Sequence, residues 1–135
     1  VSSRFRDLVE RLESGVHQFL PVDVYSSKTA AEPFDRLYWF VACNVIDSLD
    51  PVRTTLTWDG EYDVIYNGMR RGGWYFDLAV EPKQNPVFSL QAIANRHLWR
   101  DSYWTRGVVF CSDEFGDAII AAELTGFGLH RYEQV

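Results

Sequence analysis

Cysteine, basic charge and long apolar runs are all scarce in this sequence. Two cysteines among 135 residues are too few for a disulfide framework, which excludes a small secreted fold held together by disulfides. The longest apolar run, residues 37–43, is far shorter than the roughly 18 to 20 apolar residues that span a bilayer. Lysine and arginine number 13 against 19 acidic residues, and the net charge of −6 argues against a general nucleic-acid binder.

Local motifs for metals, phosphates and targeting are also missing. His17, His97 and His130 do not form an i, i+4 pair and no Cys-x-x-Cys occurs, so we expect ordinary packed or surface histidines and no metal or other cofactor. The glycine-rich stretch 68–73 lacks the lysine and hydroxyl residue of a phosphate-binding loop. Charged residues interrupt the start of the chain, which excludes a signal peptide there and favours a cytoplasmic protein with free thiols.

Apolar and aromatic residues are what the chain has in quantity. Hydrophobic residues make up 47% of it and aromatic residues 16%, enough to bury a core, which excludes disorder. The length predicts a single domain over residues 1–135. Because the first residue is Val1 rather than methionine, we expect the chain to begin inside a longer reading frame or after processing. The acidic balance leaves room for a basic protein partner.

The first half of the chain predicts a helix followed by strands. Apolar residues recur at spacings of three and four over residues 3–14, with serine before them and glycine after, as in a capped helix. Residues 16–25 predict a strand at a sheet edge, since Pro21 donates no backbone hydrogen bond. An exposed polar loop over 26–35 separates this strand from residues 37–43, which we expect to form a strand buried on both faces.

The second half predicts further strands and one more helix. Asp59-Gly60 indicates a hairpin turn between strands at 52–58 and 62–66. Further strands are expected at 74–80, 87–90, 107–111 and 124–132. Ser112 begins a helix that ends before Gly126. Without regular alternation of strand and helix, this pattern predicts an α+β fold, with a mostly antiparallel sheet of six or seven strands and two principal helices.

Two kinds of side chain could carry catalysis. Cys111 precedes the second helix, and the N-terminus of a helix lowers the pKa of a thiol. Carboxylates are paired at Asp47/Asp50 and Asp113/Asp117, although capping of turns and helices accounts for both pairs. The sequence therefore keeps open a small enzyme, a hydrolase or transferase that uses Cys111 or a carboxylate in an aromatic pocket, as the alternative to a binding protein.

The most distinctive segment is 96–106, where three arginines and one histidine alternate with two tryptophans and one tyrosine. Arginine among aromatic residues suits single-stranded nucleic acid, and it also suits a protein interface. A third interpretation is structural, with Trp99 in the core while Arg100 and Asp101 pair with neighbours. The negative net charge counts against nucleic acid, and the other two interpretations stay open.

Seven short segments occur in an order and spacing that resemble one family. They are residues 3–10 (SRFRDLVE), 15–22 (GVHQFLPV), 38–40 (YWF), 45–50 (VIDSLD), 97–101 (HLWRD), 109–113 (VFCSD) and 124–127 (LTGF). Together they resemble a bacterial family first described as a domain of unknown function and later grouped with immunity proteins of polymorphic toxin systems, the myxococcal-type immunity proteins. The resemblance covers nearly all of the chain. Since members of the family usually carry an additional segment before the first helix, it implies that this domain is the C-terminal part of a longer protein.

The resemblance implies a cytoplasmic protein that binds a cognate toxin domain and neutralises it as a stoichiometric inhibitor, not an enzyme. An acidic inhibitor suits a basic toxin such as a nuclease, because opposite charges speed encounter. Specific recognition needs variable surface, which favours the loop 26–35 and the region 59–71 as contacts. A homodimer through exposed aromatic residues stays open. The residues expected to contact the partner are Trp58, Asp59, Glu61, Tyr62, Asp63, Arg70, Arg71, Trp99, Arg100 and Trp104.

Overall fold

The computed structural model describes residues 1–66, 69–76, 84–104 and 107–135, and for residues 61–66 and 69–71 it describes the backbone alone. Its helices within this part of the chain are α1 (Ser3–Leu12), α2 (Leu90–Ile93) and α3 (Asp113–Ala121). Its strands are β1 (Gln18–Val24), β2 (Asp35–Val41), β3 (Val45–Ile46), β4 (Thr57–Tyr66), β5 (Met69–Tyr75), β6 (Val87–Phe88), β7 (Leu98–Asp101), β8 (Phe110–Cys111) and β9 (Glu133–Gln134). None of these three helices has the length and apolar character needed to cross a bilayer.

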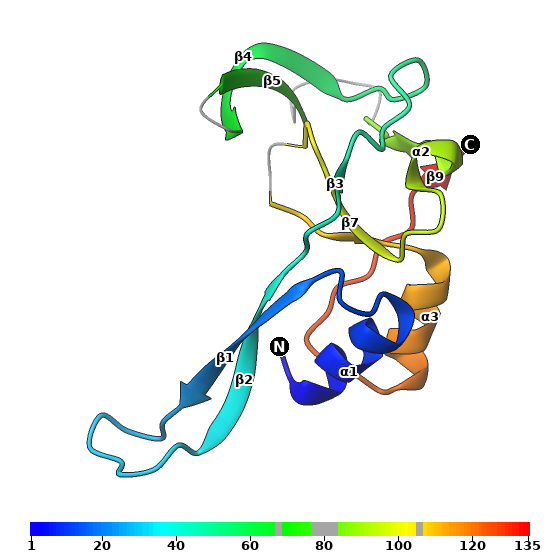
Figure 1. Cartoon of the computed structure of the whole chain (residues 1–135). Helices are drawn as coiled ribbons and strands as arrows, with labels where there is room; N and C mark the ends of the chain where they lie inside the picture. Colours follow the sequence, from blue (N-terminus) through cyan, green and yellow to red (C-terminus); the bar gives the residue numbers. More distant parts are fainter. Residues whose placement is uncertain (67–68, 77–83, 105–106) are drawn as a thin grey trace.

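The strands form four small sheets. β1–β2 and β4–β5 are antiparallel hairpins, β3–β7–β8 combines a parallel and an antiparallel pair, and β6 pairs with β9 in parallel. The two hairpins lie at opposite ends of an elongated molecule, and β1–β2 projects from its end (Figure 1). The α+β class is confirmed, but a single sheet of six or seven strands is not what the chain forms. Four of the strands have only two residues each, too few to extend a common ladder.

The two longer helices form where local signals predict them. The hydroxyl oxygen of Ser2 accepts a hydrogen bond from the Phe5 N–H, and the hydroxyl oxygen of Ser112 accepts one from the Phe115 N–H. Each serine thereby caps a helix whose first N–H groups lack partners within the helix. Gly15 follows α1 with a φ of +70°, a conformation that glycine adopts without steric cost.

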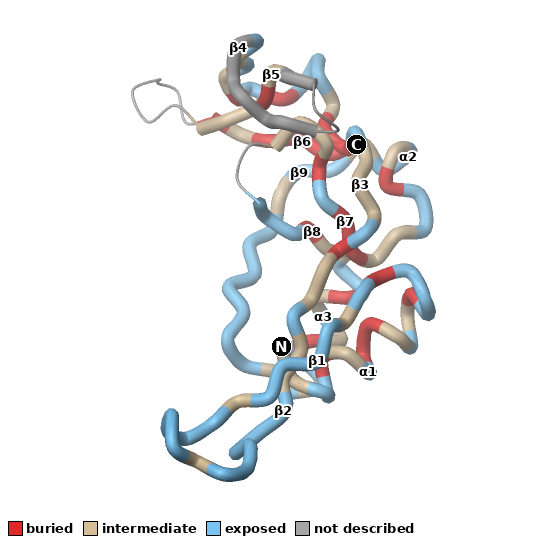
Figure 2. The backbone as a smooth tube through the Cα atoms, turned by 60° about the vertical axis from the view of Figure 1, so that its left-hand side comes forward, coloured by how far each residue is buried: buried red, intermediate tan, exposed pale blue. Residues whose placement is uncertain are grey.

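β7 separates two apolar cores. Leu98 packs into the first and Trp99 into the second, because successive side chains of a strand point to opposite faces. The first core joins α1, α3 and β7 through Phe5, Leu8, Val9, Leu98, Phe115 and Ile119. The second consists of Leu49, Leu56, Phe88, Ile93, Trp99 and Phe110. Buried positions follow these cores through the middle of the molecule, whereas the β1–β2 hairpin is exposed along most of its length (Figure 2).

The strand predicted at 37–43 exists as β2, but it is not buried on both faces. On its inner face Phe40 packs against Phe5, with ring centroids 5.3 Å apart, and joins the first core. Its outer face has no described element over it, and Trp39 is 70% exposed. The apolar run gives β2 two apolar faces, but elements distant in the sequence cover only one of them. The edge position of Pro21 is confirmed, since β1 pairs with β2 alone.

Other strand predictions need correction. Asp59-Gly60 does not turn the chain, because both residues lie inside β4, where the register against β5 shifts between Asp59 and Val64. Residues 107–111 form a strand only at their end, as β8, and residues 124–132 contain no strand. β5 reaches only the start of the strand predicted at 74–80, of which residues 77–80 lie outside the described part. The short strand predicted at 87–90 exists only at Val87–Phe88, as β6, because Ser89 caps α2 and Leu90 begins it.

Candidate functional site

Residues of the segment 97–101 form hydrogen bonds in the interior of the protein. The buried carboxylate of Asp101 accepts hydrogen bonds from the Ser48 N–H at 2.8 Å, the Ser48 hydroxyl at 2.7 Å and the Tyr103 N–H at 2.8 Å. Trp99 is only 3% exposed, and its indole Nε1–H donates to the Ser48 Oγ at 3.1 Å. Arg100, between them, has an exposed side chain. These contacts support the structural interpretation of this arginine- and aromatic-rich segment.

A second buried carboxylate, that of Glu13, joins α1 to β7. It accepts the backbone N–H groups of His97 and Leu98, both at 2.9 Å. His17 lies 2.7 Å from it through Nε2, while its Nδ1 accepts the Cys43 N–H at 3.1 Å, which places the ring proton on Nε2. No group of three or more potential metal ligands occurs among the described residues. His17 links the Glu13 carboxylate to the backbone of Cys43, whereas the His97 ring lies 3.0 Å from the Ser112 hydroxyl through Nδ1 and His130 is exposed.

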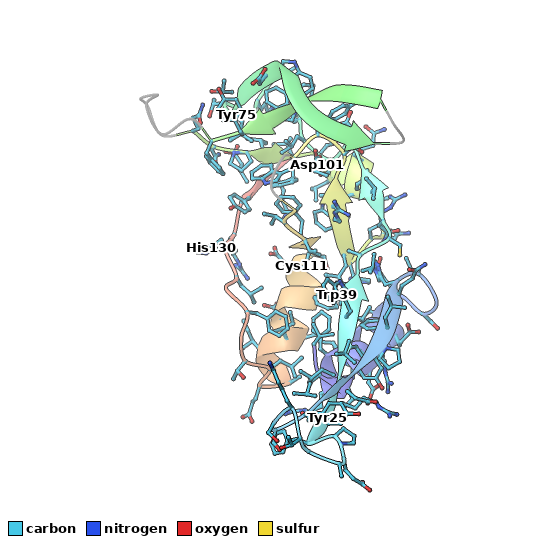
Figure 3. The ribbon with its side chains drawn as sticks, turned by 90° about the vertical axis from the view of Figure 1, so that its left-hand side faces the viewer. Tyr25, Trp39, Tyr75, Asp101, Cys111 and His130 are labelled. Carbon is cyan, nitrogen blue, oxygen red and sulfur yellow. The ribbon has the colours of Figure 1, made fainter. Side chains whose placement is uncertain are left out.

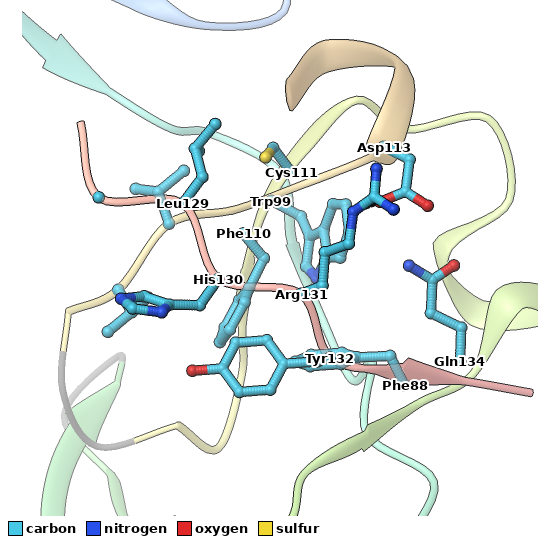
Figure 4. Close-up of a pocket in the computed structure, with 13 residues that line it drawn as sticks. Phe88, Trp99, Phe110, Cys111, Asp113, Leu129, His130, Arg131, Tyr132 and Gln134 are labelled. Carbon is cyan, nitrogen blue, oxygen red and sulfur yellow. Dashed lines mark ion pairs between the residues drawn. The ribbon is translucent and has the colours of Figure 1, made fainter. Parts of the chain in front are cut away.

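Cys111, the candidate nucleophile, lines an aromatic cavity of about 130 Å³ beneath the C-terminal segment (Figure 4). The aromatic residues of the lining are Phe88, Trp99, Phe110 and Tyr132. Burial, and after it the charge of Asp113, raises the pKa of the Cys111 thiol, which disfavours the nucleophilic thiolate. The His130 ring points away from the sulfur in the close-up (Figure 4). The pocket is therefore present, and the raised pKa of its thiol does not favour a nucleophilic role for Cys111.

The carboxylate pairs have the local contacts expected of turns and helix ends. Asp50 accepts the N–H groups of Val52 and Arg53 at 2.9 and 3.0 Å, as an aspartate does when it caps a turn. Asp113 and Asp117 are exposed on α3. Arg131 lies 3.8 Å from each of them, so its charge is shared between the two carboxylates. These contacts account for Asp50, Asp113 and Asp117, whereas partial burial, and after it the charge of Asp101, raises the pKa of Asp47.

The residues predicted to contact a partner are divided between surface and core. Trp58 is exposed on β4, where its ring packs edge-on against Trp74 and Tyr103, at centroid distances of 5.0 and 5.6 Å. Asp59 and Trp104 are partly buried. Trp74 also forms a β-bridge with Trp104, which brings the predicted Trp58 and Trp104 to the same end of the molecule. The side chains of Glu61, Tyr62, Asp63, Arg70 and Arg71 lie outside the described part, although their backbone belongs to β4 and β5.

The β1–β2 hairpin carries an exposed apolar surface that the sequence did not predict. Leu20 and Val22 on β1 and Trp39 on β2 are exposed, and Tyr25 and Phe34 are exposed in the connecting loop. Figure 3 shows Tyr25 near the tip of this hairpin and Trp39 nearer its base. The sequence did contain an indication of this surface. It predicts that residues 16–25 form an edge strand and that residues 26–35 form a polar loop, so few elements are left to cover the strand that follows them. The apolar run around Trp39 outweighed that signal and indicated a core strand.

Comparison with known proteins gives one match. A scan against protein-family models matches residues 1–134 to the immunity protein family (Imm11). Searches of curated proteins and of solved structures found no significant match. The family match extends over both cores, both buried carboxylates and the projecting hairpin, so it concerns the whole described fold. The chain therefore belongs to the immunity protein family Imm11.

Proposed function

We propose that this chain binds a cognate toxin domain in the cytoplasm and neutralises it as a stoichiometric inhibitor. The family match over residues 1–134 carries the proposal, because an immunity protein protects a cell from a toxin. The exposed tryptophans and tyrosine of the two hairpins support it, since Trp and Tyr contribute most of the binding energy at protein interfaces. The raised pKa of Cys111 supports inhibition by binding over inhibition by catalysis.

The toxin is proposed to be basic. The chain carries a net charge of −6, and α3 exposes the carboxylates of Asp113, Glu114 and Asp117 on one side of the molecule. A charge of this sign attracts a basic partner over a distance of about one Debye length and speeds encounter more than it strengthens the final complex. Association is therefore expected to slow when salt is added, with a smaller change in dissociation.

Two surfaces are proposed for toxin contact. One is the loop 26–35 together with the hairpin that carries it. The other is the β4–β5 end of the molecule, with Trp58 and Asp59. Arg100, exposed on β7, is proposed as a separate contact. Trp99 is left out of both surfaces, because a side chain that is 3% exposed offers almost no area to a partner.

A titration tests the proposal. The toxin domain encoded beside this gene is expressed alone and together with the chain in a bacterial host, and growth is measured. Growth is expected to stop with the toxin alone and to recover when the chain is present. With purified proteins, toxin activity is expected to fall linearly and reach zero at one chain per toxin. Persistent toxicity on co-expression would overturn the proposal, and so would one chain inactivating many toxin molecules, since that result indicates an enzyme.

A further inference from the structure

The outer part of the β1–β2 hairpin, residues 20–39, is called the arm. All 20 of its residues are described, and 16 are exposed, four are partly buried and none is buried. Figure 2 shows the arm extending beyond the body of the molecule. Tyr38, at the base of the arm, contacts Val1 and Arg6, whereas the arm beyond it is largely exposed, and a two-stranded hairpin by itself is only marginally stable in water. The arm therefore lacks the packing that its apolar side chains would provide if another surface covered them.

Strand addition to the edges of the arm is blocked by its own residues. Tyr38 is opposite Pro21, which has no N–H, and the backbone N–H and C=O of Tyr38 bond instead to Val1, at 2.8 and 2.7 Å. Because hydrogen-bonding direction alternates along an antiparallel strand, Pro21 faces the free edge of β1, while Arg36 and Tyr38 face the free edge of β2. The Arg36 N–H is held by the Asp35 carboxylate at 2.7 Å. A partner must therefore engage side chains of the arm rather than its backbone.

The side chains available on the arm are mainly apolar. Leu20 is opposite Trp39 and Val22 is opposite Leu37, so these four share the outer face of the hairpin. Tyr25 and Phe34, the latter 79% exposed, extend the apolar surface to the tip. The charged residues of the arm nearly balance, with Asp23, Glu32 and Asp35 against Lys28 and Arg36. Binding through the arm would therefore bury apolar area, not neutralise charge.

We infer that the arm inserts into a concave cleft of the toxin domain, an inference that rests on the proposed function. Each strand extends roughly 16 Å along the arm, and both of its faces and its tip are exposed. A flat partner covers only one face of such a projection, whereas a cleft covers both faces and the tip. Complete enclosure would bring 20 residues into contact, within the roughly 20 to 30 that one side of a stable interface contributes.

A second copy of this chain fits the arm less well. The cavities lined by described residues measure from about 130 to about 500 Å³. A two-stranded arm about 16 Å long and about 10 Å across in both other directions requires well over 1,000 Å³. Face-to-face pairing of two arms would leave the tip and the other face of each arm exposed. A cleft of the toxin domain is therefore the partner surface to test.

The experiment measures binding of the full 135-residue chain to the purified toxin domain encoded beside its gene. Trp39→Ala and Leu20→Asp alter the outer face of the arm. Leu90→Asp is the matched control, because Leu90 is 53% exposed, close to the 55% of Leu20, and lies at the start of α2 in a different part of the molecule. All three substituted side chains are exposed, so the variants are expected to fold, which far-UV circular dichroism checks.

Trp39→Ala and Leu20→Asp are each expected to raise the Kd about 10- to 30-fold, mostly through faster dissociation, and to weaken inhibition of toxin activity to the same extent. Leu90→Asp should stay within about twofold of the wild type. Unchanged Kd values in both arm variants would overturn the inference. It would also be overturned if the wild-type chain formed a dimer and Trp39→Ala converted that dimer to monomers. A wild-type chain that neither binds nor inhibits this toxin would instead overturn the proposed function, so the two failures can be told apart.

Discussion

Replacing Glu13 by glutamine is expected to destabilise the protein strongly. The carboxylate is buried and receives four donors, two at each oxygen. Oε2 accepts from His17 at 2.7 Å and from the Leu98 N–H at 2.9 Å. Oε1 accepts from the His97 N–H at 2.9 Å and from the Asn44 side chain at 3.2 Å. A glutamine fills the same volume, but its NH₂ group would face two of these donors, and neither could then donate to it.

The magnitude follows from those two lost bonds. A hydrogen bond to a charged group is worth about 1.5 to 3 kcal/mol, and a buried donor left without an acceptor adds its desolvation cost. Two such losses give about 3 kcal/mol at the low end, consistent with the range for breaking a buried charged network. For a chain of 135 residues, this corresponds to a fall in Tm on the order of 10 °C.

Urea and thermal unfolding followed by circular dichroism measure this effect. The matched control is Glu10→Gln on the same helix, where the carboxylate is more exposed and accepts a single N–H, that of Gly15, at 3.1 Å. We expect the control to lower the free energy of unfolding by less than about 1 kcal/mol. A Glu13→Gln variant no less stable than the control would refute the reasoning, because the network would then contribute nothing beyond an exposed contact.

Two further predictions concern a close approach and a titration. Gly72→Ala is expected to destabilise the β4–β5 hairpin, because a Cβ at Gly72 would lie 2.6 Å from the Trp58 ring and 2.7 Å from a backbone oxygen. Gly60→Ala is the control, since its Cβ would meet nothing closer than 3.8 Å, and it should unfold at a higher temperature than Gly72→Ala. Partial burial, and after it the charge of Asp101, raises the pKa of Asp47. The folded protein therefore holds that proton more tightly than the unfolded chain does, so ionisation of Asp47 costs stability as the pH rises above about 4. Asp47→Asn should accordingly raise the Tm at pH 7 and lose this advantage at pH 3, and an equal gain at both pH values would contradict the assigned cause.

The family could be predicted from the sequence, whereas the candidate site could be predicted only in part. The order of short segments sufficed for the family, and the match over residues 1–134 confirmed it. Trp99 was expected either in the core or at a contact surface, and it lies in the second core. Trp39 was expected in the core and is exposed. The open alternative and the error have one physical reason: an aromatic residue in a strand is compatible with burial and with a binding surface, and only the elements on either side of that strand decide between them.

Local chemistry determined what the sequence by itself could predict about this protein. The capped helices α1 and α3, the edge position of Pro21 and the loop between β1 and β2 depend on residues within a few positions of one another. The tertiary structure decided the rest through contacts between distant residues. Glu13 meets Leu98 across 85 positions, and Ser48 meets Asp101 across 53. Such contacts set which face of each strand is covered, and therefore which apolar residues form the cores and which are left on the arm for a partner.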